Sequence, residues 1–299
     1  MSEVKKVLFI INKYSGTGYE PAVEGKITDL CSTLGYESTL QFTQGTGHAT
    51  ELARQAVAEK FNLVFAMGGD GTVNETAAGL VYTNVPLGIL PKGSGNGLAR
   101  HLRIPLNFQR ALRLLQQHEV VAMDTLLVNN HISVNVSGIG FDGLIANKFG
   151  QDGTRGLWGY TRLTMREYLR FGEFGVDATI DGRSYSQHAF MVAFANASQF
   201  GNNACVSPLA SVRDGQMDVC FIRKVPFQRA IGFGYQLFTG RLNRSPLVTI
   251  VKGSAVNITF PGPMPYHIDG EGMQMAQQFA VQLRPASLKV LVPQSTAII

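Results

Sequence analysis

The stretch "LVFAMGGDGTVNE", residues 63–75, decides the fold. It begins with five apolar residues, a pattern typical of a β-strand that is buried on both faces of a sheet. Gly68, Gly69 and Gly71 then allow a sharp turn that points backbone N–H groups at a ligand, and a helix is expected over residues 71–81. The positive N-terminus of such a helix attracts anions. Taken alone, the stretch fits a tight Asp-Gly turn with Thr72 as a helix cap equally well.

The same order of strand, turn and helix repeats on both sides of this stretch. Strands are expected at residues 7–11, 37–43 and 85–90, and helices at residues 21–34 and 45–60. Two more glycine-rich loops, "NKYSGTG" and "PKGSGNGLAR", follow the first and the fourth strand. Repeated strand–helix units predict an open parallel sheet, which binds ligands outside the carboxyl ends of its strands. Three glycine loops at that edge predict a phosphate site.

Two common phosphate-binding patterns do not account for these loops. The sequence holds no GxxxxGK[ST] motif, so it is not a Walker P-loop protein. "GIGFDG", residues 138–143, fits the dinucleotide fingerprint GxGxxG. It follows a predicted hairpin and not a strand–helix–strand unit, and it lacks the acid expected about 20 residues later. We therefore do not interpret it as a dinucleotide site.

The pattern changes after residue 124. Asn129-Asn130 and Asp181-Gly182 each stand between two alternating runs, which indicates β-hairpins. Two helices are expected, at about residues 159–171 and 227–238. Further strands are expected at residues 217–222, 247–251, 255–260, 279–283 and 288–292. The second part of the chain is therefore predicted to be mostly antiparallel β.

Composition limits the class of protein. The 299 residues suggest two domains or one large one, and the net charge of +5 comes without a dense basic block or any nucleic-acid-binding motif. The three cysteines form no CxxC pair, which favours buried thiols in a reducing compartment. No apolar run approaches the ~18–20 residues that span a bilayer. The N-terminus reads as a strand and not as a signal peptide, so a cytoplasmic protein is expected.

Asp70 is unusual within a phosphate-binding loop. A carboxylate beside phosphate oxygens is repelled unless it holds Mg²⁺ or accepts a proton from an attacking hydroxyl. Either role would make Asp70 a residue of the reaction centre.

"GGDGTVNE" together with "PKGSGNGLAR" resembles the diacylglycerol kinase catalytic family, which includes bacterial lipid kinases as well as sphingosine and ceramide kinases. Further similar segments are "NKYSGTG", "TQGTGHATELA", "MDTLLVN", "NVSGIGFDG", "SVRDGQMDV" and "HIDGE". The resemblance implies an α/β nucleotide-binding domain over residues 1–124 and a β-sandwich lipid-substrate domain over residues 125–287. Residues 288–299 would return to the first domain.

The resemblance also implies site residues. The nucleotide contacts would be Asn12, Lys13, Tyr14, Ser15, Gly16, Thr43, Gly68, Gly69, Asp70, Gly71, Thr72, Val73, Asn74 and Ser94. A structural Mg²⁺ would be held by the side chain of Asp214, with backbone contacts from Ser211 and Gln216, and Asp124 would join the metal network at the reaction centre. By itself, the Asp214-Gly215 pair would be interpreted as a hairpin turn.

The proton acceptor has two candidates. The family motif places it at Glu271, with Asp269 beside it, whereas related lipid kinases assign it to the position of Asp70. By itself, Asp269-Gly270 would be a turn and Glu271 a solvated acid. His267 is expected to be a packing or hydrogen-bonding residue and not a base.

One position departs from the diacylglycerol kinase pattern. Gly97 stands where many bacterial diacylglycerol kinases carry an aspartate, so "GSGNGLA" is closer to the form of the sphingosine and ceramide kinases. The acceptor lipid therefore stays open.

The expected activity is transfer of the γ-phosphoryl group of ATP, with Mg²⁺, to the hydroxyl of a lipid such as diacylglycerol or a sphingoid base. The alternatives are an NAD kinase, which shares the GGDGT loop, and a nucleotide-binding regulatory protein without transfer activity. The sequence leaves open whether the chain forms a homodimer.

A lipid kinase without a spanning helix must visit a membrane, here the inner face. Residues 224–245, "KVPFQRAIGFGYQLFTGRLNRS", combine apolar side chains with basic flanks. They fit an interfacial helix or a helix that covers the sandwich core. "GLWGYTRLTMREYLRF", with Trp158, is the second candidate.

Overall fold

The computed structural model describes residues 4–16, 18–149 and 157–294. The chain divides into two units. Unit 1 comprises Met1–Thr125 and Pro285–Ile299, and unit 2 comprises Leu126–Arg284. Strands β5 (Glu119–Val128) and β16 (Ala276–Val292) run from one unit into the other.

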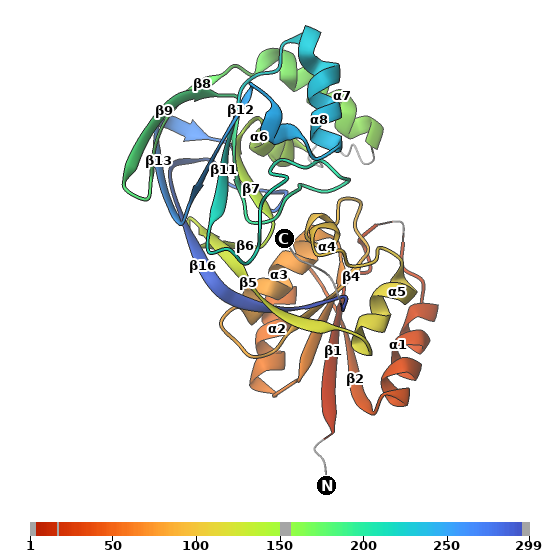
Figure 1. The fold of residues 1–299 in the computed structure, drawn as a ribbon. Helices are drawn as coiled ribbons and strands as arrows, with labels where there is room; N and C mark the ends of the chain where they lie inside the picture. The colour runs from red at the N-terminus through yellow and green to blue at the C-terminus, as the bar shows by residue number, and fades with distance from the viewer. Residues whose placement is uncertain (1–3, 17, 150–156, 295–299) are drawn as a thin grey trace. The chain divides into compact units, whose positions relative to one another are not determined.

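Unit 1 is built on a parallel sheet in the order β2-β1-β3-β4, and the last part of β16 pairs in parallel with β4. Helices α2 and α3 lie on one face of this sheet, and α1 and α5 lie on the other (Figure 1). The strands are β1 (Lys5–Ile11), β2 (Tyr36–Phe42), β3 (Leu63–Gly68) and β4 (Leu87–Pro91). The helices are α1 (Ala22–Thr33), α2 (His48–Ala58), α3 (Asp70–Leu80), α4 (Gly97–His101), α5 (Phe108–Leu112) and the 3₁₀ turn η1 (Arg113–Leu115). The predicted open parallel sheet is confirmed.

The centre of unit 1 explains why its strands are apolar throughout. The Phe9 and Phe65 rings on neighbouring strands stack with centroids 5.1 Å apart, and both are fully buried. The Phe65 ring lies where a side chain at Gly88 would project, so β4 carries a glycine there. Ile11 pairs with Met67 and Gly68 with Pro91, which brings the carboxyl ends of β1, β3 and β4 to one edge.

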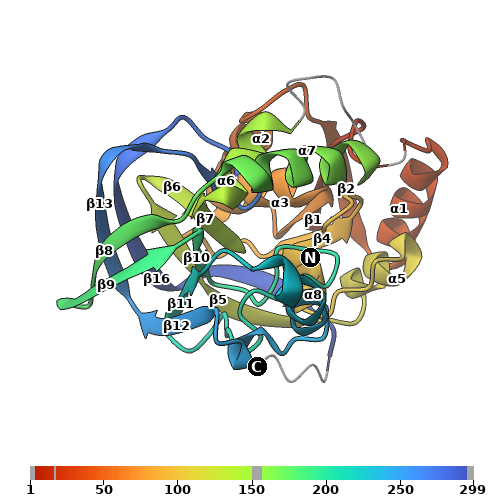
Figure 2. The ribbon, with the colours of Figure 1, turned by 90° about the horizontal axis from the view of Figure 1, so that it is seen from above.

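Unit 2 is a β-sandwich of two antiparallel sheets. One sheet has the order β16-β13-β8-β9, with β5 pairing β16 and β6, and the other has the order β12-β11-β10-β7-β14-β15. In Figure 2, β8, β9 and β13 of the first sheet lie at the left of the picture, and β7, β10, β11 and β12 of the second sheet lie to the right of them. The strands are β6 (His131–Ser133), β7 (Val136–Gly140), β8 (Phe174–Ile180), β9 (Arg183–Ala189), β10 (Met191–Ala195), β11 (Met217–Ile222), β12 (Val248–Gly253), β13 (Ala255–Met264), β14 (Tyr266–Ile268) and β15 (Glu271–Gly272). Fully buried Phe194, Phe221 and Phe279 belong to the core between the sheets. The predicted antiparallel sandwich is confirmed.

Helical segments complete unit 2. They are α6 (Phe141–Lys148), α7 (Leu157–Arg170), the 3₁₀ turns η2 (Phe227–Arg229) and η3 (Leu242–Arg244), and α8 (Ala230–Phe238). Among the residues with described positions, no helix is both long and apolar enough to cross a membrane.

Two local predictions differ from the structure. Residues 279–283 and 288–292 were expected as two strands but belong to one, β16. Ala286 has φ +47° within it, and its N–H donates to the Asp124 carboxylate at 2.7 Å, so the strand continues through this irregular residue. The expected second arm of the Asn129-Asn130 hairpin divides into β6 and β7, which belong to different sheets, and α6 was not predicted.

Candidate functional site

The first turns of α3 connect the loop after β3 to three other loops. The Asp70 carboxylate accepts hydrogen bonds from the backbone N–H groups of Asn96, at 2.9 Å, and Gly97, at 2.8 Å, in the loop after β4. Thr72 accepts a bond of 3.1 Å from the side chain of Asn12, in the loop after β1. The segment "GGDGTVNE" is therefore more than a single tight turn, because its side chains bind the neighbouring loops at one edge of the sheet.

Glu75 makes the third connection. Its two carboxylate oxygens accept the backbone N–H groups of Gly47, at 2.8 Å, and Ala49, at 3.2 Å, at the start of α2. A carboxylate at this position also interacts favourably with the positive end of the helix. The final glutamate of the motif thus fixes the loop after β2 to α3.

The glycines of these loops are required because backbones meet there. A side chain on Gly93 would begin 2.6 Å from the Cα of Gly69, which is closer than carbon atoms approach. A side chain on Gly68 would overlap Thr72, and one on Gly16 would overlap the carbonyl of Lys92. Gly16 also has φ +70°, a conformation that other residues rarely adopt. The loops after β1, β3 and β4 therefore pack backbone against backbone.

Asn96 closes the loop after β4. It has φ +52°, is 8 % exposed, and its side chain accepts the N–H of Gly93 at 3.0 Å and donates to the carbonyl of the same residue at 2.7 Å. Asn96 was not among the predicted site residues. An asparagine directly before a helix and after a glycine is a signal for this conformation, because asparagine tolerates positive φ. Ser94 lies exposed in the same loop.

Lys92 connects the loops after β4 and β1. Its ammonium donates to the carbonyl of Ser15 at 3.1 Å and to that of Gly18. Partial burial lowers the pKa of Lys92, and the nearby Glu20 opposes this shift. In the same loop the ammonium of Lys13 lies 3.7 Å from the centre of the Phe42 ring.

The structure gathers the predicted nucleotide contacts at the carboxyl edge of the sheet in unit 1. Residues 12–16 follow β1, Thr43 follows β2, residues 68–74 join β3 to α3, and Ser94 follows β4. Their side chains differ in exposure, since Tyr14 is 89 % exposed whereas Val73 is buried. The nucleotide-contact role of each residue stays a prediction.

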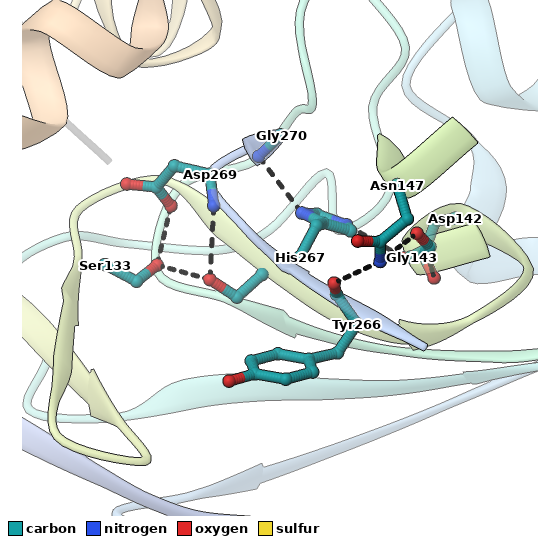
Figure 3. A network of polar contacts seen from close by, with 9 residues as sticks. Ser133, Asp142, Gly143, Asn147, Tyr266, His267, Asp269 and Gly270 are labelled. Atoms are coloured by element: carbon teal, nitrogen blue, oxygen red, sulfur yellow. Dashed lines mark hydrogen bonds and ion pairs between the residues drawn. The ribbon is translucent and has the colours of Figure 1, made fainter. Parts of the chain in front are cut away.

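Asp269 lies buried in unit 2, in the turn after β14. Its carboxylate accepts a hydrogen bond from the Ser133 hydroxyl at 2.6 Å (Figure 3). It also accepts the N–H groups of Val134, at 2.8 Å, and Asn135, at 3.0 Å. These donors form the corner where the chain leaves β6 for β7. The contacts of Asp269 are those of a residue that holds this corner, and its catalytic role stays a prediction.

His267 orients the turn before Glu271. Its Nδ1 accepts the N–H of Gly270 at 3.0 Å, so the ring proton is on Nε2, which donates to the Asp142 carboxylate at 3.1 Å (Figure 3). A side chain at Gly138 would overlap the Asp142 carboxylate, so only glycine leaves room for this pair. Both nitrogens of His267 are engaged, which agrees with its predicted hydrogen-bonding role and not with that of a base. Glu271 itself is exposed at the start of β15.

Asp142 was not among the predicted site residues. The signal that marked it was the "GIGFDG" pattern, which the sequence analysis rejected as a dinucleotide fingerprint. In the structure the pattern joins β7 to α6. Its glycines at 140 and 143 allow close packing against Phe190 and Tyr266, and its fifth residue, Asp142, pairs with His267. The motif is therefore a packing and positioning element.

The residues predicted for a structural metal are occupied by protein contacts. Asp214 accepts the N–H of Gln216 at 3.1 Å and forms an ion pair of 2.6 Å with Lys252. The same ammonium lies 3.8 Å from Asp218, whose pKa is raised by burial. In the structure, the Lys252 ammonium therefore supplies the positive charge beside the Asp214 carboxylate.

Asp124 is also engaged, because it is buried and accepts the N–H of Ala286 at 2.7 Å. Across the described part of the chain, no group of three or more histidine, cysteine or acidic side chains is arranged to hold a metal ion. Metal binding by Asp124, Ser211, Asp214 and Gln216 stays a prediction.

Both units match known protein families. Residues 6–128 match the diacylglycerol kinase catalytic domain, and residues 136–292 match the YegS C-terminal NAD kinase beta sandwich-like domain. Two proteins named "Putative lipid kinase", from the bovine RF122 / ET3-1 and Newman strains of Staphylococcus aureus, are each 24 % identical over 284 residues. The matched region covers 89 % of this chain and 90 % of either relative.

Solved structures share the fold. The chain superposes on a structure titled "putative diacylglycerol kinase" from Bacillus anthracis str. Sterne with a TM-score of 0.81, 23 % identity and 99 % coverage of both chains. A second structure from the same organism, titled as a diacylglycerol kinase, gives a TM-score of 0.75 at 22 % identity and covers both chains fully. The chain belongs to the family in which a diacylglycerol kinase catalytic domain precedes a YegS-type β-sandwich domain.

Proposed function

We propose that this protein is an ATP-dependent lipid kinase, which transfers the γ-phosphoryl group of ATP to a hydroxyl of a lipid such as diacylglycerol or a sphingoid base. The observation that carries the proposal is the set of bonds from Asp70, Thr72 and Glu75 to three other loops at the carboxyl edge of the sheet. Glycine loops at this edge are suited to phosphate oxygens, and an acid stands among them.

Asp70 has the chemistry for a role at the phosphate. Each of its oxygens accepts a backbone N–H group, and these two bonds fix the direction of the carboxylate. A carboxylate is also the type of group that accepts a hydroxyl proton or binds the Mg²⁺ that accompanies ATP as its substrate complex. Catalysis would consist mainly of positioning and charge stabilisation, as is general for phosphoryl transfer.

Glu271 is the second candidate for the proton acceptor. It directly follows the turn at residues 267–270, in which Asp269 accepts the N–H of Val134 and His267 accepts the N–H of Gly270. A base must be placed within hydrogen-bond reach of the proton it removes, so fixing the turn would matter as much as the acid itself. Asp70 and Glu271 would then divide the work between the phosphate and the hydroxyl.

The second candidate function is that of an NAD kinase, in which NAD accepts the phosphoryl group. The observation in favour of this function is the match of unit 2 to an NAD kinase beta sandwich-like domain. Gly97 in "GSGNGLA" and the names of the relatives favour a lipid.

The test is incubation with γ-labelled Mg·ATP and, in parallel, diacylglycerol, sphingosine, ceramide, NAD and a total lipid extract, with the product identified by mass spectrometry. We expect label in a phosphorylated lipid. Label only in NADP would establish the NAD kinase. Binding of ATP without product from any acceptor would indicate a regulatory protein.

A further inference from the structure

The outer face of α8 and of the turn η2 before it is apolar. Phe227 is 91 % exposed, Ile231 90 %, Phe238 59 % and Tyr235 57 %. Their spacing of four, four and three residues places them on one side of a helical segment. We call these four side chains the α8 ridge. Four large apolar side chains this exposed, and next to one another, mark an interaction site.

The inner face of α8 is already used. Phe233 and Leu237 pack against the cluster formed by buried residues such as Ala193, Ile222 and Leu242. The helix is therefore apolar on both faces, whereas a helix at the surface of a globular protein normally has a polar outer face. With nine residues it is far too short to span a bilayer, which needs about 20. Its outer face thus needs an apolar partner that lies along the surface.

The charge around the α8 ridge shows which partner fits. No aspartate or glutamate occurs between Asp218 and Asp269, whereas this segment contains six basic residues. Lys252 and Arg223 form ion pairs with acids from outside the segment. Lys224 donates to the carbonyl of Phe171. The other three basic residues, Arg229, Arg241 and Arg244, flank the ridge in sequence, and all three are exposed. The Arg241 guanidinium donates to the Tyr235 hydroxyl at 3.3 Å, directly at the ridge.

Helix α7 offers a similar surface. Leu169 is 82 % exposed and Met165 67 %, and Arg166 and Arg170 beside them are exposed as well. The Tyr168 hydroxyl donates to the carbonyl of Val225 at 2.5 Å, so the end of α7 is bonded to the segment that leads into η2. The side chain of Trp158, which the sequence marked as a membrane candidate, lies outside the described residues.

We propose that the α8 ridge inserts into the interfacial region of an anionic bilayer while Arg229, Arg241 and Arg244 contact the lipid phosphates. An apolar face with a basic rim binds in this way, through buried apolar area and attraction to anionic headgroups. The inference deepens the proposed lipid kinase function by naming the surface that meets the membrane. It requires no phosphoryl transfer.

A second copy of the chain fits less well. A two-fold interface brings the same patch of both subunits together. The exposed arginines of one copy would then face those of the other, with no acid in the segment to compensate.

The experiment is co-sedimentation of the full chain with vesicles, in the absence of ATP. One set consists of phosphatidylcholine mixed with phosphatidylglycerol, and the other of phosphatidylcholine alone. The variants are Phe227→Ser/Ile231→Ser, which shortens the ridge, and Arg229→Gln/Arg244→Gln, which reduces the basic rim. Tyr82→Asn is the matched control, because Tyr82 is a 67 % exposed apolar residue of unit 1 whose positive φ suits asparagine.

We expect the wild type and Tyr82→Asn to bind anionic vesicles, and binding to weaken with added salt and on pure phosphatidylcholine. The Phe227/Ile231 variant should lose at least about tenfold in vesicle affinity while its far-ultraviolet circular dichroism and thermal unfolding stay unchanged. The arginine variant should lose affinity for anionic vesicles only.

Equal vesicle binding by the Phe227/Ile231 variant, or no vesicle binding by the wild type, would overturn the proposal. A concentration-dependent dimer that this variant abolishes, without vesicle binding, would also overturn it in favour of self-association. The co-sedimentation contains no ATP, so a failure of the membrane proposal can be told apart from a failure of the proposed kinase activity. Transfer to a detergent-dispersed lipid by the Phe227/Ile231 variant tests that activity independently.

Discussion

Asp70 combines a structural and a proposed chemical role. Both oxygens accept backbone N–H groups of the loop after β4, so the acid joins two loops of unit 1. These bonds explain how a glycine-rich loop accommodates a negative charge. The donors stabilise the carboxylate before any ligand arrives.

We predict that Asp70→Asn lowers phosphoryl transfer by about 10²–10⁴-fold, the range of a general base. The amide can replace only one of the two acceptors, so we also expect the free energy of unfolding to fall by about 1–3 kcal/mol. Transfer from labelled ATP and urea unfolding measure the two effects. Asp29→Asn, an exposed acid on α1, is the charge-matched control. Wild-type turnover in the Asp70 variant would contradict the mechanism.

His267 allows a test of positioning. His267→Phe removes the acceptor of the Gly270 N–H and the donor to Asp142, so we expect a loss of about 1–3 kcal/mol in stability. Transfer should fall through kcat with little change in the KM for ATP, because the turn carrying Glu271 is no longer fixed. His267→Gln has both a donor and an acceptor and should restore part of kcat. If the glutamine variant recovers stability but no kcat, the histidine does more than position the turn.

His101 predicts a pH dependence of stability. Burial lowers its pKa from the ordinary 6.5 to about 4, and the positive charge of Arg103 adds to the shift. Between these values the unfolded state binds more protons than the folded state, so stability falls as pH falls through this window. We expect a loss of about 2 kcal/mol from about pH 7 to about pH 5. Urea unfolding at both pH values should show this loss for His131→Gln, an exposed control, and a smaller one for His101→Gln.

At the scale of elements, β16 is the strand that the sequence pattern divided in two. It pairs with β13 in its first half and with β4 at Val290. Between these partners Ala286 adopts φ +47°, which is unfavourable for a residue with a Cβ atom. The bond from its N–H to Asp124 holds the chain in this conformation.

Glycine substitutions at two alanines of β16 should therefore change the free energy of unfolding in opposite directions. We expect Ala286→Gly to raise the free energy of unfolding by up to about 1 kcal/mol, because glycine adopts positive φ without strain. Ala280→Gly, in the paired part of the same strand, should lower it by about 0.5–1 kcal/mol. Chemical denaturation of both variants checks the pair. A loss of stability at Ala286 would show that its conformation is not strained.

At the scale of the whole molecule, each unit holds one fully buried thiol. Cys31 lies in unit 1 and Cys220 in unit 2, and burial raises the pKa of both thiols, so neither reacts until its unit opens. Cys205 is only half-buried.

In a Cys205→Ser background, alkylation of Cys31 and Cys220 should report the opening of the two units separately. A non-hydrolysable Mg·ATP analogue at about 100 times its Kd should slow labelling of Cys31 by about 100-fold, because ligand binding stabilises the folded form by mass action. Labelling of Cys220 should be unaffected. Quantitative mass spectrometry of the labelled peptides measures both rates. Unchanged labelling of Cys31 at saturating analogue would place the nucleotide elsewhere.

The sequence by itself determined the two-part architecture and the turns. The hydrophobic periods of strands and helices are properties of the local sequence. The positive φ of Asn129 and Asp181 is also a local property, so the residue pairs Asn129-Asn130 and Asp181-Gly182 are enough to predict the two turns. The sequence also predicted that the glycine loops lie at one edge of the sheet, because the carboxyl ends of parallel strands lie at the same edge.

Only the tertiary structure decided the partners of the polar side chains. Asp142 and His267 are 125 residues apart, and Ser133 and Asp269 are 136 residues apart, yet each pair is bonded. At a corner of a sheet, backbone N–H groups have no partner strand, and a buried donor must find another acceptor. Asp269 is that acceptor for Val134 and Asn135. The local sequence contains no record of that need, so the Asp142–His267 and Asp214–Lys252 pairs emerged only when the chain was folded.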